Sequence, residues 1–275
     1  MNGKLYLVAT PIGNLEDITL RALRILKEVD LIAAEDTRQT LKLLNYFDIK
    51  KPLISNHRHN EENREDVLIE KLKEGKNIAV VSDAGTPGIS DPGEVIAKKA
   101  IEEGIEVIPI PGACAAISAL IASGLDTKEF VFYGFLPLNK KLRKEKLEEI
   151  EVETKTAIIY EAPHKLKETL KDFLEILGNR EVVLAREITK IHEEFIRGSI
   201  EEIIQKSENL KGEIILLIEG TKKEKKEKKE NFLNNLDLKD HYNFYEKQGL
   251  EKKEIIKKIA KDRGVSKNEI YKQFI

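Results

Sequence analysis

Short apolar runs alternate with amphipathic segments along the first 124 residues of the chain. Runs rich in β-branched residues, typical of buried parallel strands, predict strands at residues 4–9, 31–34, 53–56, 78–81 and 107–110. Apolar residues at helical spacing predict helices at about residues 19–29, 39–46, 63–74, 94–104 and 114–123. This alternation with short connections predicts a mostly parallel sheet covered by helices.

The pattern changes after Gly124, where strands become more frequent. Strands are predicted at residues 130–135, 155–161, 181–185, 194–198 and 213–220, and helices within residues 137–150, 164–177 and 199–206. We therefore expect a second α/β lobe that is partly antiparallel. The two lobes are placed at residues 1–118 and 119–220, with their boundary near residues 111–128.

The C-terminal part of the chain has a different composition. Residues 221–230 are almost entirely Lys and Glu, which predicts either a charged linker or a charged helix held by i,i+4 pairs. Residues 231–275 are predicted to form a small helical module. Within it, apolar spacing at 250–262, a turn at Gly264 and a helix at 268–274 capped by Ser266 are typical of a helix-turn-helix.

One loop is unusually rich in glycine and proline. It follows the strand at 78–81 and contains Gly85, Pro87, Gly88, Pro92 and Gly93. Ligands bind at the carboxyl ends of strands in such sheets, although a long connection without a ligand is the alternative. The chain has no dinucleotide or P-loop fingerprint, and residues 84–93 contain no Lys or Arg. A ligand with little phosphate charge, such as S-adenosylmethionine, therefore suits the loop best.

Composition and charge narrow the class of protein. Hydrophobic residues make up 41% of the 275 residues and charged residues 35%, as in soluble globular proteins. No apolar run is long enough to cross a bilayer, and we expect no signal peptide because residues 1–4 lead directly into a strand. Cys114 is the only cysteine, which excludes an internal disulfide and suits a reducing cytoplasm. The sequence has no zinc-type spacing, so we expect no metal.

The net charge of −2 conceals an asymmetry. Residues 222–275 carry 16 Lys and Arg against 10 Asp and Glu, whereas residues 1–221 carry 31 against 39. An acidic body with a basic appendage is therefore expected. The appendage offers cations for phosphates of a nucleic acid; they are Lys252, Lys253, Lys257, Lys258, Lys261, Arg263, Lys267 and Lys272.

Five motifs in order resemble one known family. They are Val8-Ala9-Thr10-Pro11-Ile12-Gly13-Asn14-Leu15-Glu16-Asp17, Ala34-Glu35-Asp36-Thr37-Arg38, Ser82-Asp83-Ala84-Gly85-Thr86-Pro87-Gly88-Ile89-Ser90-Asp91-Pro92-Gly93, Tyr160-Glu161-Ala162-Pro163-His164 and Ala185-Arg186-Glu187-Ile188-Thr189-Lys190. Together they resemble the ribosomal RNA small subunit methyltransferase I family, within the tetrapyrrole methylase superfamily. The resemblance covers residues 3–220 and continues weakly beyond them.

The resemblance implies a fold and an activity. It implies two α/β domains with S-adenosylmethionine in the cleft between them, usually in a homodimer. It also implies methylation of the 2′-hydroxyl of a cytidine ribose in the decoding region of 16S ribosomal RNA. Gly85-Thr86-Pro87 matches the superfamily's Gly-x-Pro segment. Porphyrin-modifying relatives carry Asp in place of Thr86, so the resemblance argues against a tetrapyrrole substrate.

Cofactor-binding residues are expected in the loops of both lobes. The candidates are Pro11, Asp83, Gly85, Thr86, Pro87, Ile89, Ser90, Cys114, Ala115, Tyr160, Ala162, Gly212 and Glu213. Cys114 and Ala115 open a helix and can present backbone N–H groups to a carboxylate. By resemblance, the last four candidates flank the adenine. The alternatives are a turn proline at Pro11, polar side chains that satisfy loop amides, and small residues that serve packing.

A ribose hydroxyl is barely ionised near neutral pH, so a base or a cation must assist methyl transfer. The candidates for this catalytic role are Glu35, Asp36, Arg38, Arg186 and Lys190, with Glu187 and His192 as further possibilities. The structural alternative is a set of ion pairs between Glu35 or Asp36 and Arg186. His57 and His59 either touch RNA or are ordinary surface histidines.

Two further functions stay open from the sequence alone. One is a nucleic-acid-binding or ribosome-assembly protein with a vestigial pocket, which the complete set of pocket motifs disfavours. The other is a small-molecule methylase of the cobalamin or siroheme route, which the basic C-terminal appendage disfavours. The resemblance implies 16S ribosomal RNA or the small ribosomal subunit as the partner, and we expect no membrane partner.

Overall fold

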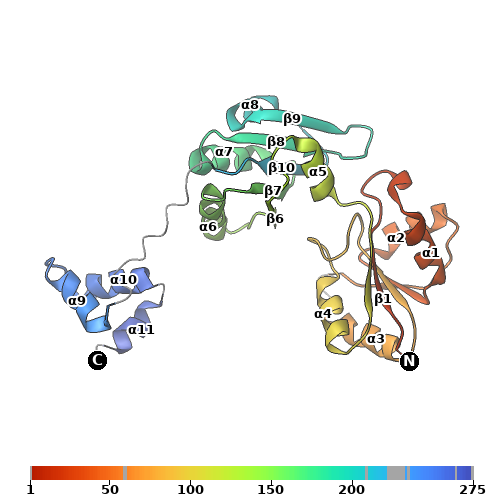
Figure 1. The fold of residues 1–275 in the computed structure, drawn as a ribbon, viewed down its shortest axis with the longest axis horizontal. Coiled ribbons are helices and arrows are strands. Elements are labelled where there is room, and N and C mark those ends of the chain that lie inside the picture. Colours follow the sequence, from red (N-terminus) through yellow and green to blue (C-terminus); the bar gives the residue numbers. More distant parts are fainter. Residues whose placement is uncertain are drawn as a thin grey trace. The chain divides into compact units, whose positions relative to one another are not determined.

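A computed structural model describes residues 2–57, 61–207, 210–221, 233, 236–263 and 265–273. The chain divides into two compact units, Met1–Thr221 and Lys222–Ile275 (Figure 1). The larger unit holds two five-stranded sheets and is described first, and the smaller unit is described by itself.

The first sheet has the strand order β3-β2-β4-β1-β5, and all its pairs are parallel. The strands are β1 (Leu5–Val8), β2 (Leu31–Ala34), β3 (Leu53–Ser55), β4 (Ile78–Val81) and β5 (Val107–Ile110). Every residue of β4 is buried, because β4 lies at the centre of a sheet covered on both faces. The predicted parallel sheet is confirmed.

Helices cover both faces of this sheet. On one face Leu26 and Leu44 lie in the core contributed by α1 (Leu20–Glu28) and α2 (Thr37–Tyr46). On the other face Leu68 and Ile96 come from α3 (Glu61–Lys73) and α4 (Glu94–Glu102). A short 3₁₀ helix, η1 (Leu15–Asp17), follows the loop after β1.

The second sheet has the order β6-β7-β10-β8-β9, in which only β6 and β7 pair in parallel. Its strands are β6 (Phe130–Phe135), β7 (Thr156–Glu161), β8 (Glu181–Arg186), β9 (Glu194–Ser199) and β10 (Ile214–Ile218). The main core of this lobe includes residues of α6 (Lys140–Glu151), α7 (Leu166–Leu177) and α8 (Ile200–Lys206). The partly antiparallel second lobe is thus confirmed.

The opposite face of the second sheet is covered by α5 (Ala115–Ser123). Ala119 and Leu120 lie in one cluster with Val183 of β8 and Leu217 of β10. Ile12, from the loop after β1, belongs to the same cluster. The lobe boundary predicted at residue 118 therefore falls within a helix that packs as a whole against the second sheet, and the two-lobe division stays a prediction.

The smaller unit contains α9 (Leu238–Glu246), α10 (Lys252–Arg263) and α11 (Lys267–Lys272). Ile255, Ile259 and Ile270 form its core, and the Ser266 side chain accepts a hydrogen bond from the Glu269 amide, as predicted for a cap. The helix α9 was not predicted from the sequence. The charged segment 222–230 and the turn at Gly264 lie outside the described residues.

A partly buried network of polar side chains links α9 to α10. Arg263 Nε donates to His241 Nδ1 at 3.2 Å, and Tyr245 donates its hydroxyl to Asp262 at 2.6 Å. Arg263 also donates to the Leu236 carbonyl. The expectation that Arg263 contacts phosphate is corrected, because its guanidinium is partly buried and holds α10 to the start of α9.

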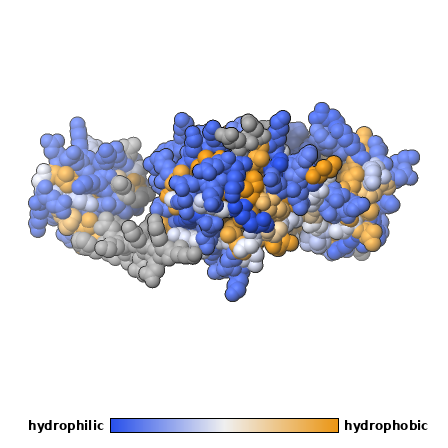
Figure 2. Space-filling model, turned by 90° about the horizontal axis from the view of Figure 1, so that it is seen from above, coloured by the Kyte–Doolittle hydropathy of each residue, from blue (hydrophilic) through white to orange (hydrophobic). Residues whose placement is uncertain are grey.

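Hydrophilic residues cover most of the face seen in Figure 2, with apolar patches among them. Single exposed apolar side chains are ordinary on a protein surface, whereas groups of them indicate contact sites. Among the described residues, no helix combines the length and apolar character that a membrane span requires.

Candidate functional site

Three loops at the carboxyl ends of β1, β4 and β5 are joined by hydrogen bonds. Thr10 and Gly85 exchange backbone bonds of 2.9 and 3.0 Å in an isolated antiparallel bridge. The Thr86 hydroxyl donates to the Ala113 carbonyl at 3.0 Å, which ties the loop after β4 to the loop after β5. The Gly/Pro-rich loop is therefore fixed at the sheet edge where ligands bind.

Gly85 occupies a position that other residues would strain. Its φ is +80°, in the left-handed region that favours glycine. A Cβ at this position would lie 3.1 Å from Ile12 Cγ2 and 3.5 Å from the Ala113 carbonyl oxygen. A side chain here would therefore disturb the junction of the three loops.

Ser90 adopts a left-handed backbone conformation with φ of +65°. Its Oγ would lie 3.1 Å from a Cβ placed on Gly134 of β6, so the loop of the first lobe comes close to the second sheet at this glycine. Non-glycine residues with positive φ are uncommon and cluster at functional sites. The close approach of Ser90 accounts for glycine at position 134.

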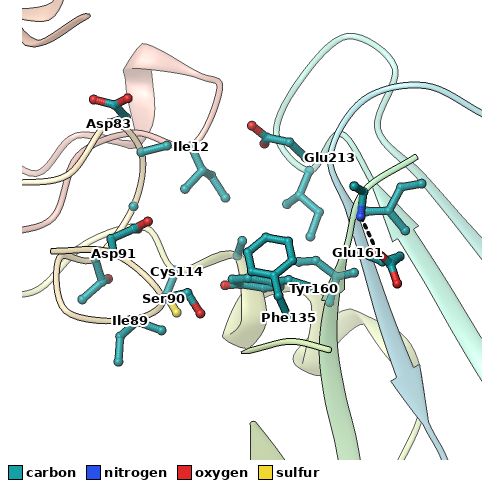
Figure 3. Close-up of a pocket in the computed structure, with 18 of the residues that line it drawn as sticks. Ile12, Asp83, Ile89, Ser90, Asp91, Cys114, Phe135, Tyr160, Glu161 and Glu213 are labelled. Atoms are coloured by element: carbon teal, nitrogen blue, oxygen red, sulfur yellow. Dashed lines mark hydrogen bonds between the residues drawn. The ribbon is translucent and has the colours of Figure 1, made fainter. Parts of the chain in front are cut away.

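The loops and the second sheet enclose a cavity of about 490 Å³ (Figure 3). This volume is within the usual range for small-molecule sites. Twelve of the predicted site residues line it: Glu35, Asp83, Gly85, Thr86, Ile89, Ser90, Cys114, Ala115, Tyr160, Ala162, Gly212 and Glu213. Loops far apart in the sequence thus meet at one cavity, and the role of each residue in binding stays a prediction.

Six predicted site residues are not among those that line the cavity: Pro11, Pro87, Asp36, Arg38, Arg186 and Lys190. Nine lining residues were not predicted: Ile12, Ala84, Asp91, Phe135, Glu161, Pro163, Ile188, Ile214 and Ile215. Most of the nine are immediate neighbours of predicted residues. Phe135 has no predicted site residue beside it in the sequence. The only sequence feature that could have indicated it is an aromatic side chain at the end of a predicted strand.

The lining of the cavity is acidic. It contains the carboxylates of Glu35, Asp83, Asp91, Glu161 and Glu213, and none of the described lining residues is Lys or Arg. Figure 3 shows Asp83 and Asp91 on one side of the open space and Glu213 across from them. Such a lining repels phosphates and attracts a cationic ligand.

Asp36 has a structural role at the start of α2. Its carboxylate accepts the Arg38 amide at 2.8 Å and pairs with the Arg38 guanidinium at 2.7 Å. The hydrogen bonds from Arg38 lower the pKa of Asp36 to about 2, so this carboxylate is a poor base at neutral pH. The Asp36 amide donates to Asp83, and the Asp83 amide donates to Glu35 at 3.3 Å.

Arg186 pairs with Glu194 of the neighbouring strand at 2.6 Å. Asp36 pairs with Arg38, and Arg186 pairs with Glu194. The alternative of an ion pair between Asp36 and Arg186 is therefore wrong. Of the predicted basic or acidic catalytic candidates, Glu35 alone lines the cavity.

The loop after β8 holds a cation at the edge of the cavity. Lys190 Nζ contacts Glu187 at 3.0 Å and Glu213, a lining residue, at 3.2 Å. Burial opposes the charged form, but the hydrogen bonds that Lys190 donates to both carboxylates outweigh it and raise the pKa of Lys190. A Cβ on Gly13 would lie 2.4 Å from Lys190 Cγ, so the lysine stem crosses the loop after β1.

Glu187 shapes the backbone at Gly212. The Glu187 carboxylate accepts the Glu213 amide at 2.9 Å and lies where a Cβ of Gly212 would be. This backbone hydrogen bond is the main cause of the lowered pKa of Glu187. Glycine at 212 is therefore required by the fold of the wall, where φ is +92°.

Aromatic rings form another wall. Phe135 and Phe132 both meet Tyr160 edge to face, at centroid distances of 5.6 and 5.0 Å. Figure 3 shows the rings of Phe135 and Tyr160 beside each other. Burial raises the pKa of Tyr160 to about 12, so its phenol stays protonated near neutral pH. The rings give the cavity a flat apolar surface suited to a planar ring. His57 is not among the lining residues, and His59 lies outside the described residues.

Comparison with known proteins gives the family. The family model described as Tetrapyrrole (Corrin/Porphyrin) Methylases matches residues 4–204. The chain is 56% identical to the ribosomal RNA small subunit methyltransferase I of Halalkalibacterium halodurans and 52% identical to that of Bacillus subtilis. Each alignment covers 98% of this chain and 93% of the relative. The chain belongs to the ribosomal RNA small subunit methyltransferase I family. The predicted methyltransferase and its donor, S-adenosylmethionine, are thereby confirmed.

Solved structures agree with the fold of this family. The methyltransferase CobJ is 17% identical, with a TM-score of 0.62 over 80% of this chain and 95% of that chain. Uroporphyrin-III C-methyl transferase from Thermus thermophilus, solved with S-adenyl homocysteine, is 18% identical, with a TM-score of 0.56 over 79% and 97%. At these identities the likeness shows the fold, and the predicted tetrapyrrole methylase architecture is confirmed.

Proposed function

We propose that this protein methylates the 2′-hydroxyl of a cytidine ribose in 16S ribosomal RNA, in the cytoplasm. The observation that carries the proposal is the acidic, cation-free lining of the 490 Å³ cavity, formed by the motif loops of this methyltransferase family. Among the described residues, no group of three or more His, Cys, Asp or Glu is arranged to hold a metal ion.

The cavity fits the methyl donor. S-adenosylmethionine carries a sulfonium and an ammonium group, which carboxylates such as Asp83, Asp91 and Glu213 attract. Its adenine has flat faces that can pack against the ring of Tyr160, which lines the cavity. The Ala115 end of α5 offers backbone N–H groups to the donor's carboxylate. When bound, the donor supplies an electrophilic methyl group, and correct positioning of the acceptor provides much of the rate.

The charged residues near the cavity have three different roles in the proposed reaction. Glu35 accepts the proton of the ribose hydroxyl, because its carboxylate lines the cavity whereas Asp36 is engaged by Arg38. Lys190 stays protonated and stabilises the developing negative charge on the ribose oxygen or holds the adjacent phosphate. Asp36, Arg38 and Arg186 position the loops through their ion pairs.

A methyl-transfer assay tests this function. The protein is incubated with S-adenosylmethionine labelled in the methyl group and with either 16S RNA or small ribosomal subunits. We expect label in 2′-O-methylcytidine after digestion to nucleosides. Label on a base, on another nucleoside, or in a uroporphyrinogen or precorrin substrate offered in parallel would contradict the proposal.

We also propose that the protein works as a homodimer. The support is membership of a superfamily whose members usually dimerise, together with exposed apolar side chains such as Ile117 and Ile121 on one face of α5. Light scattering at micromolar concentration should report a dimer. A monomer at that concentration would contradict this proposal without affecting the proposed activity.

The smaller unit is proposed to support RNA binding. Exposed lysines such as Lys252, Lys257 and Lys267 lie on α10 and α11, clear of the core at Ile259. Truncation after Thr221 keeps the hydrogen bond that the Thr221 amide donates to the Glu153 carbonyl, and it leaves the larger unit intact. We expect nearly unchanged cofactor affinity, weaker RNA affinity and a shallower salt dependence. Full RNA affinity with the same salt slope would show that this unit does not contact RNA.

A further inference from the structure

The start of α6 combines basic and apolar side chains in a way that the fold does not explain. The residues concerned are Phe135, Leu138, Lys140, Lys141, Leu142 and Lys144, which we call the α6 strip. Exposed fractions are 59% for Phe135, 78% for Leu138 and 54% for Leu142. The three lysines are exposed as well.

The lysines of the strip lie at the N-terminal end of α6, where the helix dipole disfavours positive charge. The first turn of α6 has no acidic residue, although the positive end of a helix dipole favours Asp and Glu there. Lys141 makes only a long, exposed contact with Glu145 at 3.8 Å, which contributes little stability. A local arrangement that does not stabilise the fold is a sign of function.

The strip begins at the cofactor cavity. Phe135 lines that cavity and also ends β6, and only residues 136–139 separate it from Lys140. The Cα atoms of Phe135 and Lys140 are therefore at most about 18 Å apart. A polymer bound along the strip would have one of its units at the mouth of the cavity.

The strip is also held firmly to the cavity wall. Arg143 donates to Asp172 at 2.7 Å and to the Thr169 hydroxyl at 2.7 Å. The Thr169 hydroxyl in turn donates to Glu161, which lines the cavity and accepts the Ala162 amide at 2.8 Å. This chain of hydrogen bonds fixes the start of α6 relative to the wall at Glu161 and Ala162.

We propose that the α6 strip binds a single-stranded RNA segment next to the target nucleotide, with its phosphates on the three lysines and a base against Phe135. The inference rests on the proposed RNA substrate and names a contact surface in the larger unit. The chemistry is that of sequence-tolerant single-strand sites, which combine cations for the backbone with exposed rings on which bases stack. Leu138 and Leu142 add apolar surface for base or ribose faces.

Two triple variants with the same charge change test the strip. The first is Lys140→Gln, Lys141→Gln and Lys144→Gln. The control is Lys27→Gln, Lys50→Gln and Lys98→Gln, at three exposed lysines of the first lobe that do not line the cavity. Affinity for 16S RNA and for small subunits is measured across salt concentrations, and S-adenosylhomocysteine affinity is measured by calorimetry.

We expect the strip variant to lose at least about tenfold in RNA affinity relative to the control, and to lower the salt slope by about 2. S-adenosylhomocysteine affinity should match that of the wild type. Equal losses in both variants, or no loss in either, would overturn the proposal. A loss restricted to assembled subunits would indicate a protein contact and would also overturn it.

A second arm tests stacking at the cavity mouth. Phe135→Ala should weaken RNA binding about tenfold, whereas Phe135→Tyr, which keeps a ring, should restore RNA affinity. Equal RNA affinity for the two variants would contradict stacking. If the wild-type protein transfers no methyl group to 16S RNA, the proposed function fails, whereas a failure confined to these variants rejects only the strip.

Discussion

Replacing Gly85 by valine should abolish cofactor binding, with a loss of affinity of at least about a hundredfold. The branched side chain would collide with Ile12, 3.1 Å from the Cβ position, and would strain a backbone with φ of +80°. Both effects disrupt the Thr10–Gly85 bridge that forms one side of the cavity. Calorimetry with S-adenosylhomocysteine measures the loss.

Gly104→Val is the matched control for backbone strain. Gly104 has a φ of +67°, but its Cβ position has nothing within 4 Å and it does not line the cavity. This variant should lose some stability and keep its cofactor affinity. Normal binding by Gly85→Val, with native circular dichroism, would place the cofactor elsewhere.

Replacing Glu35 by glutamine should lower the rate of methyl transfer by about a hundredfold or more, because an amide cannot accept the ribose proton. Cofactor affinity should change little, since glutamine keeps the size of the side chain and can still accept the Asp83 amide. The measurement is kcat with 16S RNA or subunits at saturating S-adenosylmethionine, alongside calorimetry.

Glu94→Gln provides the control for Glu35→Gln. Glu94 is exposed at the start of α4, just after the same Gly/Pro-rich loop, and does not line the cavity. It should keep full activity. If Glu35→Gln also keeps its activity, the base is a different group, and Glu213 would be the next carboxylate to test.

The fold of the larger unit followed from the sequence because most of its strands are short, apolar and bounded by polar loop residues. The run at Ile78–Val81 is buried along its whole length, and its neighbours alternate with helices that have a clear apolar face. The motif loops after β1, β2 and β4 then had to meet, since parallel strands present their carboxyl ends at one edge.

The sequence could not show which charged residues face the cavity. Glu35 and Asp36 are adjacent, yet Asp36 caps α2 and Glu35 lines the cavity. Arg186 is four residues from Lys190, but a strand partner at Glu194 engages it. These outcomes depend on side-chain partners that are distant in the chain or set by backbone geometry. Phe135 was missed as a site residue because one exposed ring at a strand end has no distinctive spacing.

The location of the cofactor is the central claim, and a crystal structure with S-adenosylhomocysteine tests it most directly. We predict electron density for the ligand inside the cavity, in contact with Gly85, Ser90 and Ala115 on one side and with Tyr160 and Ala162 on the other. Density for a fully occupied ligand outside this cavity, with the cavity empty, would contradict the account.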